Sequence, residues 1–187
     1  MGCVGDKYYL KKDFSPPAGV AILPINNHTT DMDGPSVVRY WLGSKLAEKK
    51  GYDVRSFDAT DGFLKELGVT DGGQLAAVSV ADVCRKLGVD ALIYGDLLDF
   101  AYQTTGFINA RKVRARFRMH DCKTGERIWE AEGVGASSKG ALSGKEALKA
   151  GLSHLGTQFF DKASGSPLKY EAMDMAWDAI QFLPRAR

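Results

Sequence analysis

KVRARFRMHDCKTGERIWEAE, residues 112–132, alternates between two kinds of side chain. The apolar set is Val113, Ala115, Phe117 and Met119, and the polar set is Lys112, Arg114, Arg116, Arg118 and His120. A period of two predicts a strand with one apolar and one basic face. The turn at 121–126 contains Gly125 where a positive φ is needed, and residues 127–132 return as the partner strand. This stretch therefore predicts an antiparallel hairpin.

Upstream of the hairpin, strands alternate with a helix. The apolar run at 20–25 predicts a buried strand, the spacing of apolar residues in 37–47 predicts an amphipathic helix, and residues 52–57 alternate with a period of two. A strand, a helix and a strand in this order form a right-handed parallel crossover. The strongest buried strand is expected at 90–100, and an irregular piece is expected at 102–109.

Further helices are expected on both sides of the hairpin, at 63–67, 78–87, 145–160 and 170–182. The last has Met173, Ala176, Trp177 and Ile180 as its expected apolar side. The fold class is α/β (α+β): a mixed sheet with two or three parallel strands plus an antiparallel hairpin, and helices packed on the sheet. Residues 1–17 lack periodicity and are expected to be a flexible tether, followed by a single domain at 18–187.

Composition excludes several classes of protein. Apolar residues make up 44% and charged residues 26% of the 187 residues, so the chain can bury a core. The net charge of +2 indicates no global basic field for nucleic acid or an anionic membrane. No apolar run approaches the ~18 residues that a spanning helix needs. The composition therefore predicts an ordinary globular domain.

Polar residues follow the first two predicted strands, at the ends of parallel strands where α/β proteins bind ligands. These candidate ligand or partner loops contain Asn26, Asn27, His28, Asp31, Asp58 and Asp61. Asp in such loops also serves as a helix cap or turn residue. The sequence contains no nucleophile elbow, phosphate-binding loop or dinucleotide motif, and its three histidines have no metal-ligand spacing. We therefore expect no catalytic residues, no cofactor and no metal, and thus a protein that is not an enzyme.

The basic stripe at 112–120 allows three interpretations. A nucleic-acid face would need aromatic residues among the arginines, but Phe117 falls on the opposite face. The returning strand brings acidic residues nearby, which favours a solvated face of paired charges, and nucleic acid is not an expected partner. A subunit interface is the third interpretation, and its candidate residues are Arg114, Arg116, Arg118 and Trp129.

Three cysteines raise two separate questions. Cys84 and Cys122 either form a disulfide or are small buried hydrophobes, and the sequence leaves both open. Cys3 is a lipid attachment point, a remnant of a longer precursor or an inert thiol. The start of the chain also resembles dually acylated eukaryotic proteins, although Asp6 stands where that pattern needs Ser or Thr.

Four stretches together resemble the CsgG-like lipoproteins: VAILPINN at 20–27, LAEKKGY at 46–52, LGVDALIYGD at 87–96 and DCKTGERIW at 121–129. The resemblance covers about residues 18–135. It is greatest to a family of bacterial lipoproteins of unknown function that includes a surface vaccine-candidate antigen. That family is similar in fold to the amino-terminal domain of TolB and to LpoB.

The resemblance implies a cell-envelope protein that is cleaved from a signal peptide and lipidated at its first mature residue, here Cys3 after Gly2. It implies a non-enzymatic binding or assembly accessory in transport, secretion or envelope assembly. We expect a homo-oligomer with an envelope protein partner, attached to the membrane through the lipid alone. Val4 rather than Asp follows the cysteine, which favours the outer membrane, with the domain in the periplasm or at the cell surface. Residues 101–112 and 133–144 are too short and glycine-rich for membrane-inserting hairpins, so no pore is expected.

The alternative is a domain that binds a small molecule or nucleotide through the candidate loops.

Overall fold

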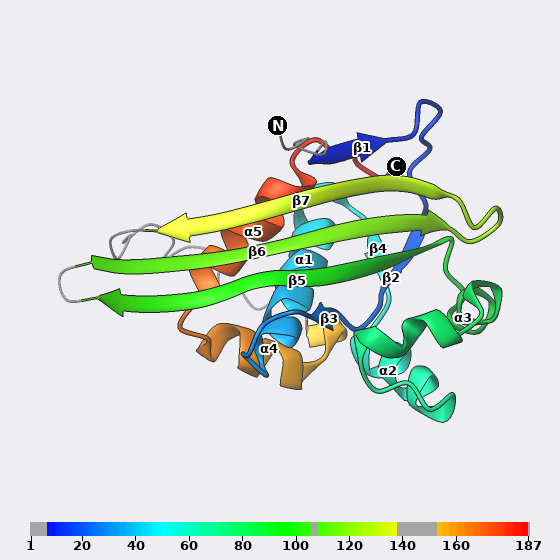
Figure 1. Ribbon diagram of the computed structural model, residues 1–187. Coiled ribbons are helices and arrows are strands. Elements are labelled where there is room, and N and C mark those ends of the chain that lie inside the picture. Colours follow the sequence, from blue (N-terminus) through cyan, green and yellow to red (C-terminus); the bar gives the residue numbers. More distant parts are fainter. Residues whose placement is uncertain (1–6, 106–107, 138–152, 187) are drawn as a thin grey trace, which may run out of the picture.

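The computed structural model describes residues 7–105, 108–137 and 153–186, which form a mixed sheet with helices packed against it (Figure 1). The order of the strands across the sheet is β1-β7-β6-β5-β2-β4, and β3 pairs with β5 outside this path. The strands are β1 (Tyr8–Leu10), β2 (Gly19–Ile22), β3 (Asn26–Asn27), β4 (Asp53–Val54), β5 (Ala91–Thr105), β6 (Ile108–Asp121) and β7 (Arg127–Ser137).

The helices form two unequal layers. Figure 1 shows α1 and α5 crossing behind β5, β6 and β7, with α4 below them, whereas α2 and α3 lie beside β2 at one end of the sheet. The helices are α1 (Gly34–Lys50), α2 (Phe57–Glu66), η1 (Gly72–Ala77), α3 (Val80–Leu87), η2 (Ser153–Leu155), α4 (Thr157–Gly165) and α5 (Lys169–Ile180).

The first half of the chain forms the predicted parallel part of the sheet. Strand β2 pairs in parallel with both β4 and β5, and α1 connects β2 to β4. Pro35 lies in the first turn of α1 and Gly51 ends the helix, as the sequence predicts. Strand β4 is only two residues long because Phe57, expected in the strand, is the first residue of α2.

The second half forms the predicted antiparallel hairpin of β6 and β7, in which Phe117 pairs with Ala131. It also forms a second antiparallel hairpin, of β5 and β6, that the sequence did not predict. Strands β5 and β6 pair from Ala91↔Asp121 to Thr105↔Ile108, so the irregular piece expected at 102–109 is wrong. Backbone pairing continues where the side chains show no periodicity, since the ladder uses only main-chain groups. A register shift between Leu97 and Asp99 bends β5 along the way.

The N-terminal segment departs from the expected tether. Residues 8–10 form β1, which pairs antiparallel with the edge strand β7. The Lys11 amide donates to the Ile128 carbonyl at 3.0 Å, and the Glu132 amide donates to the Lys7 carbonyl at 2.8 Å. Three residues are too few to show a period, but they satisfy backbone groups that the β7 edge would otherwise expose. The flexible tether over all of 1–17 is therefore wrong for this strand.

The large core lies between the α1, α4 and α5 layer and one face of the sheet. Val113, Ala115, Phe117 and Met119 of β6 are completely buried there, as the alternation predicts. Strand β7 lies close to α5 because it lacks side chains at Gly133 and Gly135. A Cβ atom at Gly135 would lie 1.9 Å from the Glu171 carbonyl oxygen. A smaller core fills the space between β2 and the α2, η1 and α3 layer.

The C-terminal helices differ in detail from the prediction. Of the helix expected at 145–160, residues 145–152 lie outside the described part, and α4 begins only at Thr157. Helix α5 buries Ala172, Met175 and Ala179, whereas Trp177, expected on its apolar side, is 45% exposed. Small side chains on α5 let it approach β7, and this packing decides which face is buried. None of the described helices has the length and apolar content needed to cross a membrane.

Candidate functional site: the open face of the sheet

One face of β5, β6 and β7 is not covered by any helix of the described chain (Figure 1). The alternation within β6 places its apolar side chains toward α5 and its arginines on the other side. Helices α2 and α3 do not reach this area because they pack beside β2. We call this surface the open face and define it by Asp96, Asp99, Arg114, Arg116, Arg118, Glu130 and Glu132.

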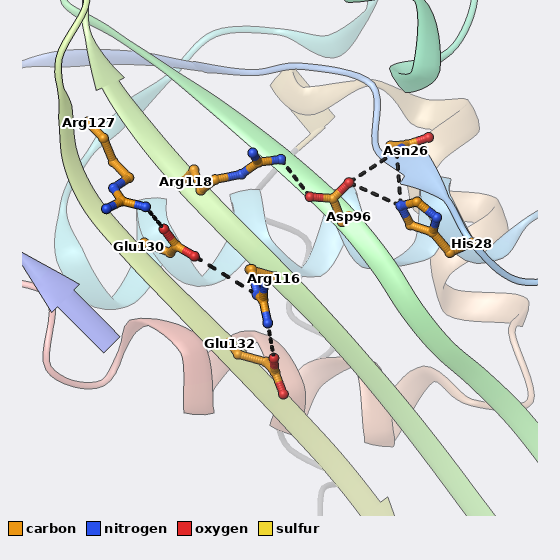
Figure 2. Close-up of polar contacts among 8 residues, drawn as sticks. All are labelled: Asn26, His28, Asp96, Arg116, Arg118, Arg127, Glu130 and Glu132. Carbon is orange, nitrogen blue, oxygen red and sulfur yellow. Dashed lines mark hydrogen bonds and ion pairs between the residues drawn. The ribbon is translucent and has the colours of Figure 1, made fainter. Parts of the chain in front are cut away.

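Ion pairs cross the open face from strand to strand (Figure 2). An Nη atom of Arg118 lies 2.6 Å from Asp96, and one of Arg116 lies 3.1 Å from Glu132. The Nε atom of Arg114 lies 2.9 Å from the Asp99 carboxylate. Cross-strand pairing therefore accounts for these arginines. The returning strand supplies the partner of Arg116, as predicted, but Arg118 and Arg114 pair with carboxylates of β5, which the prediction did not include.

The positive and negative groups lie at different depths in the open face. The Glu132 side chain is 6% exposed, whereas the Arg116 side chain above it is 50% exposed. Asp96 is likewise 18% exposed beneath an Arg118 side chain that is 40% exposed. In these two pairs the guanidinium group is therefore the outer one, whereas Arg114 and Asp99 are exposed to a similar degree.

Asp96 joins the open face to the loop after β2. Its carboxylate accepts a hydrogen bond from the Asn26 amide at 3.1 Å and lies 3.2 Å from Nε2 of His28, as Figure 2 shows. Burial raises the pKa of Asp96, but the hydrogen bonds from Asn26 and His28 and the charge of Arg118 outweigh it, so the pKa is lowered. Sequence reasoning missed Asp96; the signal was a carboxylate within an otherwise apolar strand.

Two cavities flank Asn26. One, of about 380 Å³, lies between η1 and the sheet and is lined by Tyr94, Asp96 and Arg118 among others. The other, of about 490 Å³, lies at the carboxyl end of β2 next to the starts of α1 and η1. Its lining includes Asn26, Asn27, Arg39, Asp61, Asp71 and Phe159.

The structure separates the remaining loop candidates. Asp61 lies 2.8 Å from the guanidinium of Arg39, which is buried and also donates to the Ile22 carbonyl. The Asp31 carboxylate accepts hydrogen bonds from the amides of Asp33 and Gly34, so it caps the start of α1. Asp58 is exposed in the first turn of α2. Of the six candidates, Asn26, Asn27 and Asp61 line the larger cavity.

Trp129 does not belong to any exposed interface. Its side chain is completely buried on the helix-covered face of β7, so its place among the surface candidates is wrong. Trp129 lies on the same face as the buried Ala131 and opposite Glu130 and Glu132, so the alternation along β7 itself places Trp129 on the covered side. Tyr9 of β1 lies close to the open face instead, with its ring 4.8 Å from the Arg127 guanidinium.

Cys84 and Cys122 form a disulfide that joins α3 to the turn after β6, with their Cα atoms 5.9 Å apart. Both cysteines border the smaller core. Within residues 7–105, 108–137 and 153–186, no three His, Cys, Asp or Glu side chains come together as a metal-binding group. Cys3 lies outside these residues.

The comparison with protein families covers most of the chain. The family described as "Putative lipoprotein GNA1162-like" matches residues 8–163, from β1 into α4. The chain belongs to this family of GNA1162-like lipoproteins. The wider CsgG-like and TolB-like relationship stays a prediction.

Relatives of this GNA1162-like chain agree with the assignment. "Putative lipoprotein NMB1124/NMB1162" of Neisseria meningitidis is 25% identical over 133 residues, which are 68% of this chain and 61% of the relative. The crystal structure of lipoprotein GNA1162 from Neisseria meningitidis has a TM-score of 0.57 and 19% identity, and the match covers 80% of this chain and all of that one. The chain thus spans about 61% of the length of its curated relative.

The same fold occurs in PelC from Paraburkholderia phytofirmans, which was solved as a dodecamer. The match has a TM-score of 0.58 and 14% identity and covers 96% of each chain. At this identity, the likeness shows a shared fold alone. The comparison therefore shows that this chain and PelC share an architecture.

Proposed function

We propose that this GNA1162-like lipoprotein is a non-enzymatic accessory of the bacterial outer membrane that docks an acidic envelope protein on its open face. The observation that carries the proposal is the layer of guanidinium groups above buried carboxylates. Arginine is enriched in protein interfaces, and a planar guanidinium binds carboxylates through two parallel hydrogen bonds. The buried carboxylates hold the arginines in place, which lowers the entropy lost when a partner binds.

The proposed compartment depends on Cys3 and on the disulfide. A diacylated or triacylated Cys3 would supply the two or more chains that stable anchoring requires. The disulfide between Cys84 and Cys122 favours an oxidising compartment such as the periplasm. Val4 after the cysteine favours the outer membrane over the inner one. Homo-oligomerisation is part of the proposal and is suggested by the PelC dodecamer.

Labelling with a radioactive fatty acid in the native host tests the anchor. The natural chain should incorporate the label and fractionate with the outer membrane, and the Cys3→Ser variant should do neither. A natural chain that stays unlabelled, or that fractionates with the inner membrane, contradicts this part of the proposal.

Charge reversal tests the docking surface. We expect the double variant Arg116→Glu and Arg118→Glu to lose its crosslinked partner in intact cells, because like charges then face an acidic surface. Arg85→Glu is the matched control, since Arg85 is an exposed arginine on α3 outside the open face. The control should keep its crosslinks. Crosslinks that also survive in the double variant would refute docking on the open face.

A second candidate function uses the larger cavity. We propose a small polar ligand there as the alternative, because Asn26, Asn27 and Asp61 line a space of about 490 Å³ at the carboxyl end of β2. A thermal-shift screen of nucleotides, sugars and amino acids tests it. A hit should disappear in Asn27→Ala and persist in Asp53→Ala, a control on β4 away from the cavity. The absence of hits would end this alternative.

A further inference from the structure

The pairing of β1 with β7 limits how far the folded chain can lie from a lipidated cysteine. Tyr8, the first residue of β1, follows Cys3 by five residues. Five extended residues span at most about 18 Å. If Cys3 carries the lipid, as the proposed function states, the β1 edge of the sheet therefore lies close to the membrane surface. The expected tether of 17 residues would have imposed no such orientation.

Exposed aromatic side chains surround the point at which the chain enters β1. Phe182 is 69% exposed and follows α5, and its ring lies 6.0 Å from that of Tyr8. The Tyr8 hydroxyl also donates to the Phe182 carbonyl. Trp177, one turn earlier on α5, is 45% exposed. We call Tyr8, Trp177 and Phe182 the aromatic patch. Figure 1 shows the segment that follows α5 passing beside β1 at this edge of the molecule.

Basic side chains border the aromatic patch. The Lys50 ammonium lies 5.7 Å from the centre of the Trp177 ring and donates to the Gln181 carbonyl. Burial and the nearby charge of Arg185 lower the pKa of Lys50. Within the described residues, neither Lys50 nor Arg185 has a carboxylate at ion-pair distance. An anionic group from outside the chain would relieve this repulsion. The arginines of the open face, by contrast, already form ion pairs with carboxylates of the same sheet.

We propose that the aromatic patch and its basic border are a membrane-contacting surface that binds the headgroup region of an anionic phospholipid leaflet. Trp and Tyr favour the membrane interface because their rings are apolar and their tips are polar. Cations near that surface are attracted to anionic lipid. The assignment orients the domain with the β1 edge of the sheet toward the bilayer.

The size of the aromatic patch favours lipid over a protein partner. A stable protein interface buries well over 1,000 Å², with a core of several anchoring side chains. Two exposed rings bordered by the exposed Arg185 and the largely buried Lys50 do not reach this size. They suffice for a lipoprotein because the acyl chains supply most of the affinity, while the patch adds weak binding and orients the domain.

Trp177 makes the proposal directly measurable. The other two tryptophans, Trp41 and Trp129, are buried, so Trp177 is the one that collisional quenchers can reach. The test uses the full chain, isolated from its native membranes and reconstituted into phosphatidylethanolamine and phosphatidylglycerol vesicles with brominated acyl chains. Brominated lipid should quench Trp177, and acrylamide in the water should reach it less than in detergent solution. Trp177→Phe gives the background from the two buried tryptophans.

A second arm removes the lipid anchor. The Cys3→Ser chain should bind vesicles containing phosphatidylglycerol, and Phe182→Ser in that chain should weaken binding about tenfold, the effect of withdrawing one aromatic side chain from an apolar environment. Leu67→Ser is the matched control, since Leu67 is 48% exposed at the end of α2, outside the aromatic patch.

The outcomes separate this inference from the lipid anchor. A labelled, anchored chain whose Trp177 is not quenched by brominated lipid overturns the membrane-contacting surface and leaves the anchor. If the natural chain is not labelled but its Cys3→Ser form binds vesicles through Trp177, the membrane-contacting surface is supported and the lipid anchor is overturned. Protection of Trp177 from acrylamide without quenching by brominated lipid means that a protein covers the patch, which also overturns the inference.

Discussion

The two faces of strand β6 differ in almost every property although the same backbone carries both. On one face Phe117 is completely buried under α5 and its neighbours. On the other, the adjacent Arg116 is half exposed and paired with Glu132. Burial of apolar area gives the first face its stability, whereas exposed ion pairs contribute little to stability and much to recognition. One strand thus separates the residues that hold the fold from those that the proposed function uses.

Adjacent substitutions in β6 test this separation most strongly. Phe117→Ala should lower the free energy of unfolding by about 3–5 kcal/mol, because it leaves a cavity in the large core. Arg116→Ala, one residue away, should lower it by at most about 1 kcal/mol. Denaturant unfolding of both variants measures the contrast. Similar losses for the two would show that the open face also stabilises the fold.

Removing the disulfide tests whether the layer of α2, η1 and α3 can open independently of the layer of α1, α4 and α5. Replacing Cys84 and Cys122 with serine should cost about 2–4 kcal/mol, because the bond closes a loop across a sequence separation of 38 residues. Hydrogen exchange should then increase in α3 more than in α5, which packs on the opposite face. Uniform acceleration across both layers would contradict their independence.

Close packing of β7 on α5 makes the covered face intolerant of an added methyl group. Gly135→Ala should cost about 1–3 kcal/mol, because the new Cβ would meet the backbone of Glu171. Gly62→Ala is the matched control: a Cβ there meets no atom within 4 Å, and alanine should be neutral or stabilise α2 by up to about 1 kcal/mol. Thermal unfolding distinguishes the two. Equal effects would mean that the contact with α5 does not decide the result.

Lowering the pH should destabilise the open face, and this loss of stability should be the smallest of the four effects. The folded-state pKa values of Asp96 and Asp99 are lowered: burial opposes ionisation, but hydrogen bonds and nearby cations outweigh it. Their contribution is therefore present above the unfolded pKa of about 4 and is lost as the pH falls through the folded values. Asp96→Asn should flatten the decline in stability below pH ~4. An unchanged slope would show that Asp96 contributes no pH dependence.

Periodicity predicted the elements of the fold better than their faces and ends. The β6–β7 hairpin, α1 and the parallel pairing of β2 were visible because each buries one regular set of side chains. The short strand β1 was missed because three residues show no period and because its partner strand is far away in sequence: Tyr9 pairs with Glu130, 121 positions later. Trp177 was assigned wrongly to the buried side of α5. The buried side is set by the close approach of α5 to Gly135 of β7, and a contact between such distant segments leaves no periodic signal in the sequence.

The candidate site was also predicted only in part, because periodicity shows which side chains are exposed and not which distant segments meet. The arginines were found because alternation exposes them, and their pairing followed from the acidic partner strand. Asp96 was missed because its environment is assembled from β5, β6 and the loop after β2, three segments that no local pattern relates. Trp129 was misplaced because it was grouped with the arginines, although the alternation of β7 places it opposite Glu130 and Glu132.

The position of the disulfide has a consequence for survival among envelope proteases. Cys84 precedes β5 and Cys122 follows β6, so the bond closes a covalent ring around the whole hairpin. A single cut of the backbone anywhere between these cysteines, including one at the hairpin tip, leaves one covalently continuous molecule. The two pieces would stay joined beside α3, and the cleaved strands could pair again. The part of the sheet that projects farthest from the helices is therefore the part that a single proteolytic event cannot detach.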